Sequence, residues 1–122
     1  MELIGKYDMS NTERQVLEYL WESNDAVKNR DLLEIFTSKG KKWKPQTLNT
    51  ILFRLNEIGL VIRERGTVRA AYTKQEYDAM VANDILETSY EGKLSNFVAA
   101  LTGGATISDE VYEELRKLID EK

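Results

Sequence analysis

Residues 44–59 read KPQTLNTILFRLNEIG, and this stretch decides the fold of the chain. Its apolar residues recur at the i, i+3, i+4 and i+7 spacing of a helix that buries one face. The core-facing set comprises Leu48, Ile51, Leu52, Leu55 and Ile58. Pro45, the only proline, is favoured at the first helical position, where its missing N–H costs no hydrogen bond. The remaining side chains must then point outward: Gln46, Thr47, Asn49, Thr50, Phe53, Arg54 and Glu57.

Two shorter helices are predicted before this one. Ser10 and Glu13 have the spacing of a capping box, in which two side chains satisfy free backbone N–H groups at a helix start. The helix that follows carries one apolar stripe, formed by Val16, Leu17, Leu20 and Trp21. The second helix carries Leu32, Leu33, Ile35 and Phe36. It is expected to end near Gly40, because glycine readily takes the left-handed conformation that closes a helix.

A β-hairpin is predicted after the third helix. Residues 60–62 are β-prone, the charged stretch RERGTVRA turns at Gly66, and residues 68–72 form the return strand. Three short helices followed by a basic hairpin describe a winged helix-turn-helix within a mainly α-helical protein. We assign residues 1–73 to this DNA-binding domain.

The remaining residues, 74–122, return to a helical pattern. Thr73 and Glu76 form another capping box. These residues are too few to hold a core of their own, so their apolar stripes need a partner. The most economical partner is the same segment of a second chain. The expected dimerisation residues are Tyr77, Met80, Val81, Ile85, Val98, Leu101, Leu115, Leu118 and Ile119.

Charge is unevenly distributed along the chain. The formal net charge is -4, but residues 39–69 contain eight basic and two acidic residues, a local net charge of +6. From residue 74 onward, five basic residues face eleven acidic ones, a local net charge of -6. A basic block beside an acidic tail is expected when one segment docks on phosphate and another has a different task.

Composition excludes several classes of function. The chain has no cysteine, which removes disulfides, thiolate metal sites and thiol chemistry, and it has no histidine, the commonest general base and metal ligand. We therefore expect no enzyme, no metal and no cofactor. No stretch approaches the roughly 18 apolar residues of a membrane span, and no signal peptide is evident, so we expect a cytoplasmic protein without membrane insertion.

The outward residues of the third helix suit DNA recognition. Polar side chains near the start of a helix in the major groove contact base edges, while flanking basic residues hold phosphates. The expected DNA-binding residues are Lys42, Lys44, Gln46, Thr47, Thr50, Arg54, Arg63 and Arg65. Trp21 and Trp43 are expected to pack in the core rather than stack on single-stranded bases. Phe53 is an outward aromatic that touches either DNA or the wing.

The third helix alone can also be an ordinary amphipathic surface helix. Two alternatives from other functional classes remain at this point. The winged helix can be a module that binds only proteins, against which the local net charge of +6 argues, or the chain can be an enzyme, against which the absence of histidine and cysteine argues.

Three segments together resemble the penicillinase repressor family and its copper-responsive relatives. These segments are TERQVLEYLW (residues 12–21), WKPQTLNTILFRLNEIGLV (residues 43–61), and a tail made of SYEGKLSNFVAAL and ISDEVYEELRKLID (residues 89–101 and 107–120). The resemblance covers nearly the whole chain. It implies a homodimeric repressor, bound to a palindromic operator of double-stranded DNA ahead of resistance genes until the repressor is inactivated.

The resemblance also implies roles for single residues. The family's DNA contacts fall on Gln46, Thr47, Thr50 and Arg54, and position 46 is commonly lysine in the family, so glutamine here should change phosphate attraction or base preference. The wing is shorter than the usual pattern and lacks its proline, so the resemblance assigns no individual wing contacts. The cysteine motif of the copper-responsive relatives is absent. The β-lactam-responsive members are cut by a membrane sensor metalloprotease at an Asn-Phe bond, and Asn96 and Phe97 stand at the matching place; Phe97 can equally be plain dimer core.

Overall fold

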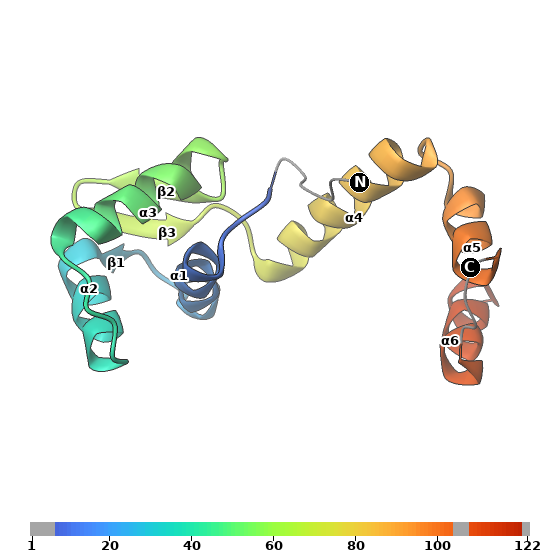
Figure 1. The fold of residues 1–122 in the computed structure, drawn as a ribbon, viewed down its shortest axis with the longest axis horizontal. Coiled ribbons are helices and arrows are strands. Elements are labelled where there is room, and N and C mark those ends of the chain that lie inside the picture. Colours follow the sequence, from blue (N-terminus) through green and yellow to red (C-terminus); the bar gives the residue numbers. More distant parts are fainter. Residues whose placement is uncertain (1–6, 104–107, 121–122) are drawn as a thin grey trace. The chain divides into compact units, whose positions relative to one another are not determined.

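The computed structural model describes residues 7–103 and 108–120, which form helices and strands in one order along the chain (Figure 1). The elements are α1 (Asn11–Glu22), β1 (Val27–Lys28), α2 (Asn29–Ser38), α3 (Pro45–Glu57), β2 (Val61–Glu64), β3 (Thr67–Ala70), α4 (Lys74–Tyr90), α5 (Leu94–Gly103) and α6 (Asp109–Asp120). They divide into two compact units, of which the first reaches to Val81 and the second begins at Ala82. The first unit thus includes the start of α4. The functional boundary at residue 73 remains a prediction.

Local sequence signals set the helix starts. The Glu13 amide donates to Ser10 Oγ over 3.1 Å, and the Ser10 amide donates to Glu13 Oε1 over 2.9 Å, so the capping box of α1 is complete. Thr73 and Glu76 make the same pair of bonds at the start of α4. Pro45 occupies the first position of α3. These three predicted helix starts are confirmed.

The wing, residues 61–70, is part of a three-stranded antiparallel sheet with the order β1-β3-β2. Arg65 and Gly66 link β2 to β3 with φ angles of 50° and 76°, the positive values that tight hairpin turns require. The winged helix is confirmed, with corrections to its strands. The first strand of the hairpin covers Val61–Glu64 rather than residues 60–62, and the return strand covers Thr67–Ala70 rather than residues 68–72. The third strand, β1, was not predicted because two residues are too short to show an alternating pattern.

The core of the first unit is apolar and draws on all three helices and the sheet. Its buried residues are Val16, Leu17, Leu20, Leu32, Phe36, Leu48, Ile51, Leu52, Leu55, Leu60, Val61, Val68 and Tyr77. Trp21 and Trp43 are partly buried and pack against this cluster, as predicted. The Trp43 ring stacks on Phe36 with 4.9 Å between centroids, and so closes the joint between α2 and α3.

Tyr77 lies in this core, although it was expected to have no partner within one chain. Its side chain is 7% exposed, its ring lies 5.1 Å from that of Trp21, and Val81 packs against the same cluster. That expectation is wrong for Tyr77 and Val81, because the start of α4 packs on the winged helix. Their contribution to a dimer contact remains a prediction.

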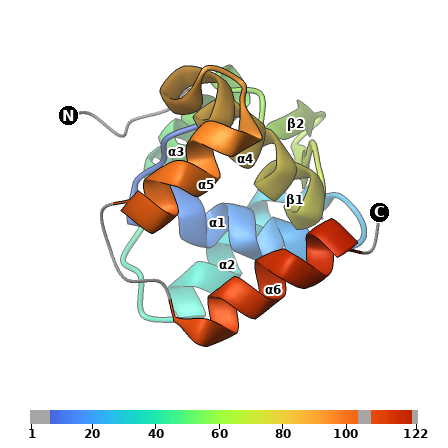
Figure 2. The ribbon, with the colours of Figure 1, turned by 90° about the vertical axis from the view of Figure 1, so that its right-hand side faces the viewer.

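The second unit contains the rest of α4 together with α5 and α6, drawn in orange and red in Figure 2. Glu91 and Gly92 have φ angles of 56° and 73°, and this left-handed pair separates α4 from α5. Across the turn, the Tyr90 and Phe97 rings meet edge to face with 5.4 Å between centroids. The side chains of Leu118 and Ile119 lie outside the described residues. None of the described helices combines the length and apolar character needed to cross a bilayer.

Candidate nucleic-acid interface

The outer face of α3 consists of the side chains that point away from the core. All are exposed, as the helical spacing predicts: Gln46, Thr47, Asn49, Thr50, Phe53, Arg54 and Glu57. Phe53 is 55% exposed, although it is a large aromatic residue. The Thr50 hydroxyl donates to the Gln46 carbonyl oxygen over 3.0 Å, which leaves its oxygen free to accept and its methyl group to pack. Arg54 stands in the last turn of α3.

The start of α3 is suited to an anion. Lys44 occupies the N-cap position but provides no side-chain cap hydrogen bond. Pro45 has no N–H and the Thr47 amide donates to the Lys44 carbonyl oxygen over 2.9 Å, so the positive end of the helix dipole, rather than a set of free amides, favours negative charge at this position. Lys42 and Lys44 are exposed beside it. A DNA phosphate is the expected ligand of this arrangement.

The wing is fixed to the helix that precedes α3. The Asn29 amide, at the first position of α2, donates to the Gly66 carbonyl oxygen in the wing turn over 2.9 Å. Next to it, β1 pairs with β3 through Val27 opposite Val68 and Lys28 opposite Thr67. The wing turn, with the exposed Arg65, is therefore held in a defined position relative to α2.

Arg63 connects the wing to the outer face of α3. It shares a face of β2 with the buried Val61, two residues earlier, and stands opposite the buried Val68. This face of the sheet is turned toward the core, and Arg63 is the last residue of β2 on this face before the wing turn. There Nη2 of Arg63 donates to Oδ1 of Asn49 over 2.6 Å.

Sequence reasoning missed this bond. Arg63 was predicted only as a basic residue flanking the helix, and Asn49 as one of the outward polar residues that can reach bases, but the two were not linked. The two residues are 14 positions apart, and no local pattern indicates that their side chains meet.

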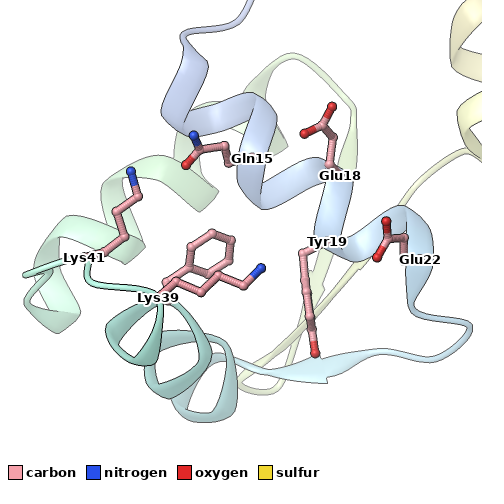
Figure 3. A pocket seen from close by; sticks show the side chains of 7 residues that line it. Gln15, Glu18, Tyr19, Glu22, Lys39 and Lys41 are labelled. Carbon is pink, nitrogen blue, oxygen red and sulfur yellow. The ribbon is translucent and has the colours of Figure 1, made fainter.

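A hollow of about 450 Å³ lies outside this interface (Figure 3). It is lined by Gln15, Glu18, Tyr19, Glu22, Phe36, Lys39 and Lys41. The Lys39 ammonium lies over the Tyr19 and Phe36 rings, 5.6 and 5.1 Å from their centroids, so this member of the basic block is engaged within the chain. Within residues 7–103 and 108–120, no group of three or more acidic, histidine or cysteine side chains could hold a metal ion.

Comparison with known proteins places these features in one family. The family model described as "Penicillinase repressor" matches residues 9–121. The chain belongs to the penicillinase repressor family. It is 23% identical to the methicillin resistance regulatory protein MecI of Staphylococcus aureus, with 95% of this chain and 96% of the relative aligned. It is 25% identical to the penicillinase repressor of Bacillus licheniformis, with 93% and 90% aligned.

Membership confirms the resemblance found in the sequence. The family consists of transcriptional repressors, which act on DNA and are not enzymes. The chain is therefore a DNA-binding transcriptional repressor, and the exposed face of α3, its open N-terminus and the wing are its candidate DNA interface.

Proposed function

We propose that this repressor binds a palindromic DNA operator as a homodimer and controls antibiotic-resistance or related stress genes. The names of its relatives, a methicillin resistance regulatory protein and a penicillinase repressor, support this class of genes. Identity near one quarter over the full length supports the shared architecture rather than a shared operator.

One observation carries the DNA-binding part of the proposal: the outer face of α3 is exposed, is polar except for Phe53, and is preceded by lysines at a helix start without a side-chain cap. Gln46, Thr47 and Thr50 are short enough to approach base edges, and the threonine methyl groups suit thymine. The positive groups proposed to hold phosphates are Lys42, Lys44, Arg54 and Arg65.

The second unit supports the homodimer. Ile85 and Leu94 are 46% and 62% exposed within one chain. They line an apolar hollow with Leu86 and Phe97. Burial of such side chains against a second copy is favourable, so we assign dimerisation to this unit. The remaining residues proposed for it in this unit are Val98, Leu101 and Leu115, with Leu118 and Ile119 beyond the described side chains. Met80, near the end of the first unit, is also proposed for the dimer contact.

A sensor metalloprotease is the proposed inactivating partner. The Asn96–Phe97 bond lies in the first turn of α5, where both amides donate to the Lys93 carbonyl oxygen. The Asn96 side chain also donates to the Tyr90 carbonyl oxygen over 3.2 Å. This turn must open before a protease can bind it in an extended conformation.

Salt dependence and two substitutions test the DNA contacts. We expect log K to fall by about 0.9 per phosphate contact for each unit of log salt concentration. Arg54→Ala should weaken binding to all duplexes alike and reduce this slope by about one contact. Thr47→Ala should cost roughly 1 to 3 kcal/mol, mainly on a duplex that the protein has selected from a random pool. Fluorescence anisotropy titrations on selected and random duplexes measure both effects.

Arg116→Ala and Thr88→Ala serve as matched controls, because both residues are exposed and lie in the second unit. They should leave affinity and salt slope unchanged. Binding that does not depend on salt would contradict the phosphate contacts, and an equal loss for Thr47→Ala on random DNA would contradict base recognition.

A further inference from the structure

We propose that Arg63 recognises a guanine in the operator and that Asn49 is the residue that positions it. The inference rests on the proposed DNA binding and adds to it a pair that determines sequence specificity. The sequence assigned Arg63 only to the charged flank of the interface.

The first argument is where the guanidinium lies. Gln46, Asn49, Thr50 and Phe53 follow the i, i+3, i+4, i+7 spacing and form one row along the exposed side of α3. Asn49 is in the middle of this row, and Nη2 of Arg63 lies 2.6 Å from its Oδ1. The guanidinium therefore stands beside the side chains proposed to approach base edges, although Arg63 belongs to the wing.

The other wing arginines do not share this placement. Arg69 stands opposite Ile62 in the sheet, so its side chain lies on the other face of the sheet from that of Arg63. Arg69 is also exposed. Arg65 is exposed in the hairpin turn. Both are suited to phosphate, which requires charge but no fixed orientation.

The second argument is chemical. A guanidinium has five N–H donors in a planar fork, and Asn49 takes up a donor on one nitrogen, so others remain for the O6 and N7 acceptors of guanine. Asparagine alone is suited to adenine, to which its amide oxygen must accept a hydrogen bond. Here that oxygen accepts from Arg63, and the remaining guanidinium groups are all donors. They match the two acceptors of guanine but not the N6 donor of adenine, so the pair favours guanine over adenine.

The third argument is rigidity. The wing is tied to α2 through the bond from the Asn29 amide to the Gly66 carbonyl oxygen and through the pairing of β1 with β3. With Asn49 holding its tip, Arg63 is fixed at both ends. A side chain held in this way loses little conformational entropy when it binds a base, and it discriminates better than a mobile one.

The test is selection from a pool of duplexes with a randomised centre, using the full chain and two variants. Wild-type protein should enrich a site with a guanine at one position of each half-site, preferred by about 5- to 150-fold over other bases. Arg63→Lys keeps the charge but lacks the planar fork, so this preference should fall to less than about twofold while affinity for the unselected pool is unchanged. Asn49→Ala should reduce the preference at the same position.

Arg116→Lys is the matched control, with the same change and the charge retained at an exposed residue outside the proposed interface. It should leave the selected sequence unaltered. If Arg63→Lys selects the same sequence as wild type, or if both Arg63→Lys and Asn49→Ala only lower thermal stability and affinity on all duplexes, the inference is overturned and the pair is a structural brace. If wild-type protein enriches no common sequence, the proposed operator binding itself fails.

Discussion

A chain that ends after Asn96 is expected to bind its operator at least about 100-fold more weakly than the full chain. The truncation removes most of α5 and all of α6, and with them Val98, Leu101 and Leu115 of the proposed dimer contact. Two linked winged helices bind two half-sites with an effective local concentration that separate monomers lack. The protein surface that contacts DNA stays the same. Analytical ultracentrifugation and operator titration on the same samples measure both parts of this prediction.

The fragment must retain a folded first unit for this comparison. Trp21 and Trp43, the only tryptophans, both lie in that unit, so their fluorescence reports its folding separately from the tail. A fragment that stays dimeric and binds as tightly as the full chain would show that the tail does not make the dimer.

Tyr77→Ala is expected to destabilise the first unit by about 3 to 5 kcal/mol, the usual cost of deleting a buried aromatic side chain. Tyr77 lies near the start of α4, and its side chain is buried against the winged helix. Its ring lies 5.1 Å from Trp21 and 6.3 Å from Tyr7, and the Arg14 guanidinium lies 5.7 Å from its centroid. Urea unfolding followed by tryptophan fluorescence gives the change in midpoint and in free energy of unfolding.

Ile85→Ala is the matched control on the same helix. Ile85 is exposed in one chain and belongs to the second unit, so the free energy of unfolding of the first unit should change by less than about 0.5 kcal/mol. Dimer dissociation should instead become easier. If Tyr77→Ala leaves the unfolding of the first unit unchanged and weakens only the dimer, our account of Tyr77 as a core residue is wrong.

Features encoded over a few neighbouring residues were predictable from the sequence. Ser10 with Glu13 and Thr73 with Glu76 satisfy backbone groups three residues apart, and Pro45 acts through its own ring. The helical spacing in residues 44–59 likewise determines which side chains face outward. Such signals act between near neighbours and do not depend on tertiary packing. The three helices, the hairpin and the outer face of α3 could therefore be predicted from them.

Features that depend on distant partners were not predictable. The stripe that includes Tyr77 showed that one side of α4 is apolar, but not that its start would bury this side against Trp21 of the same chain. The strand β1 exists because Val27 and Lys28 find β3, about 40 residues later in sequence, and two residues carry no pattern of their own. The bond between Asn49 and Arg63 likewise depends on how the wing folds back on α3.

Hydroxyl-radical footprinting of the full chain on a duplex selected from a random pool tests the central claim most directly. A symmetric dimer that inserts one α3 into each of two half-sites should protect two segments related by a two-fold axis, with centres about 10 base pairs apart or a multiple of that spacing. Both segments should appear at the same protein concentration. A single protected segment, or even protection of the whole duplex, would contradict a symmetric dimer that recognises two half-sites.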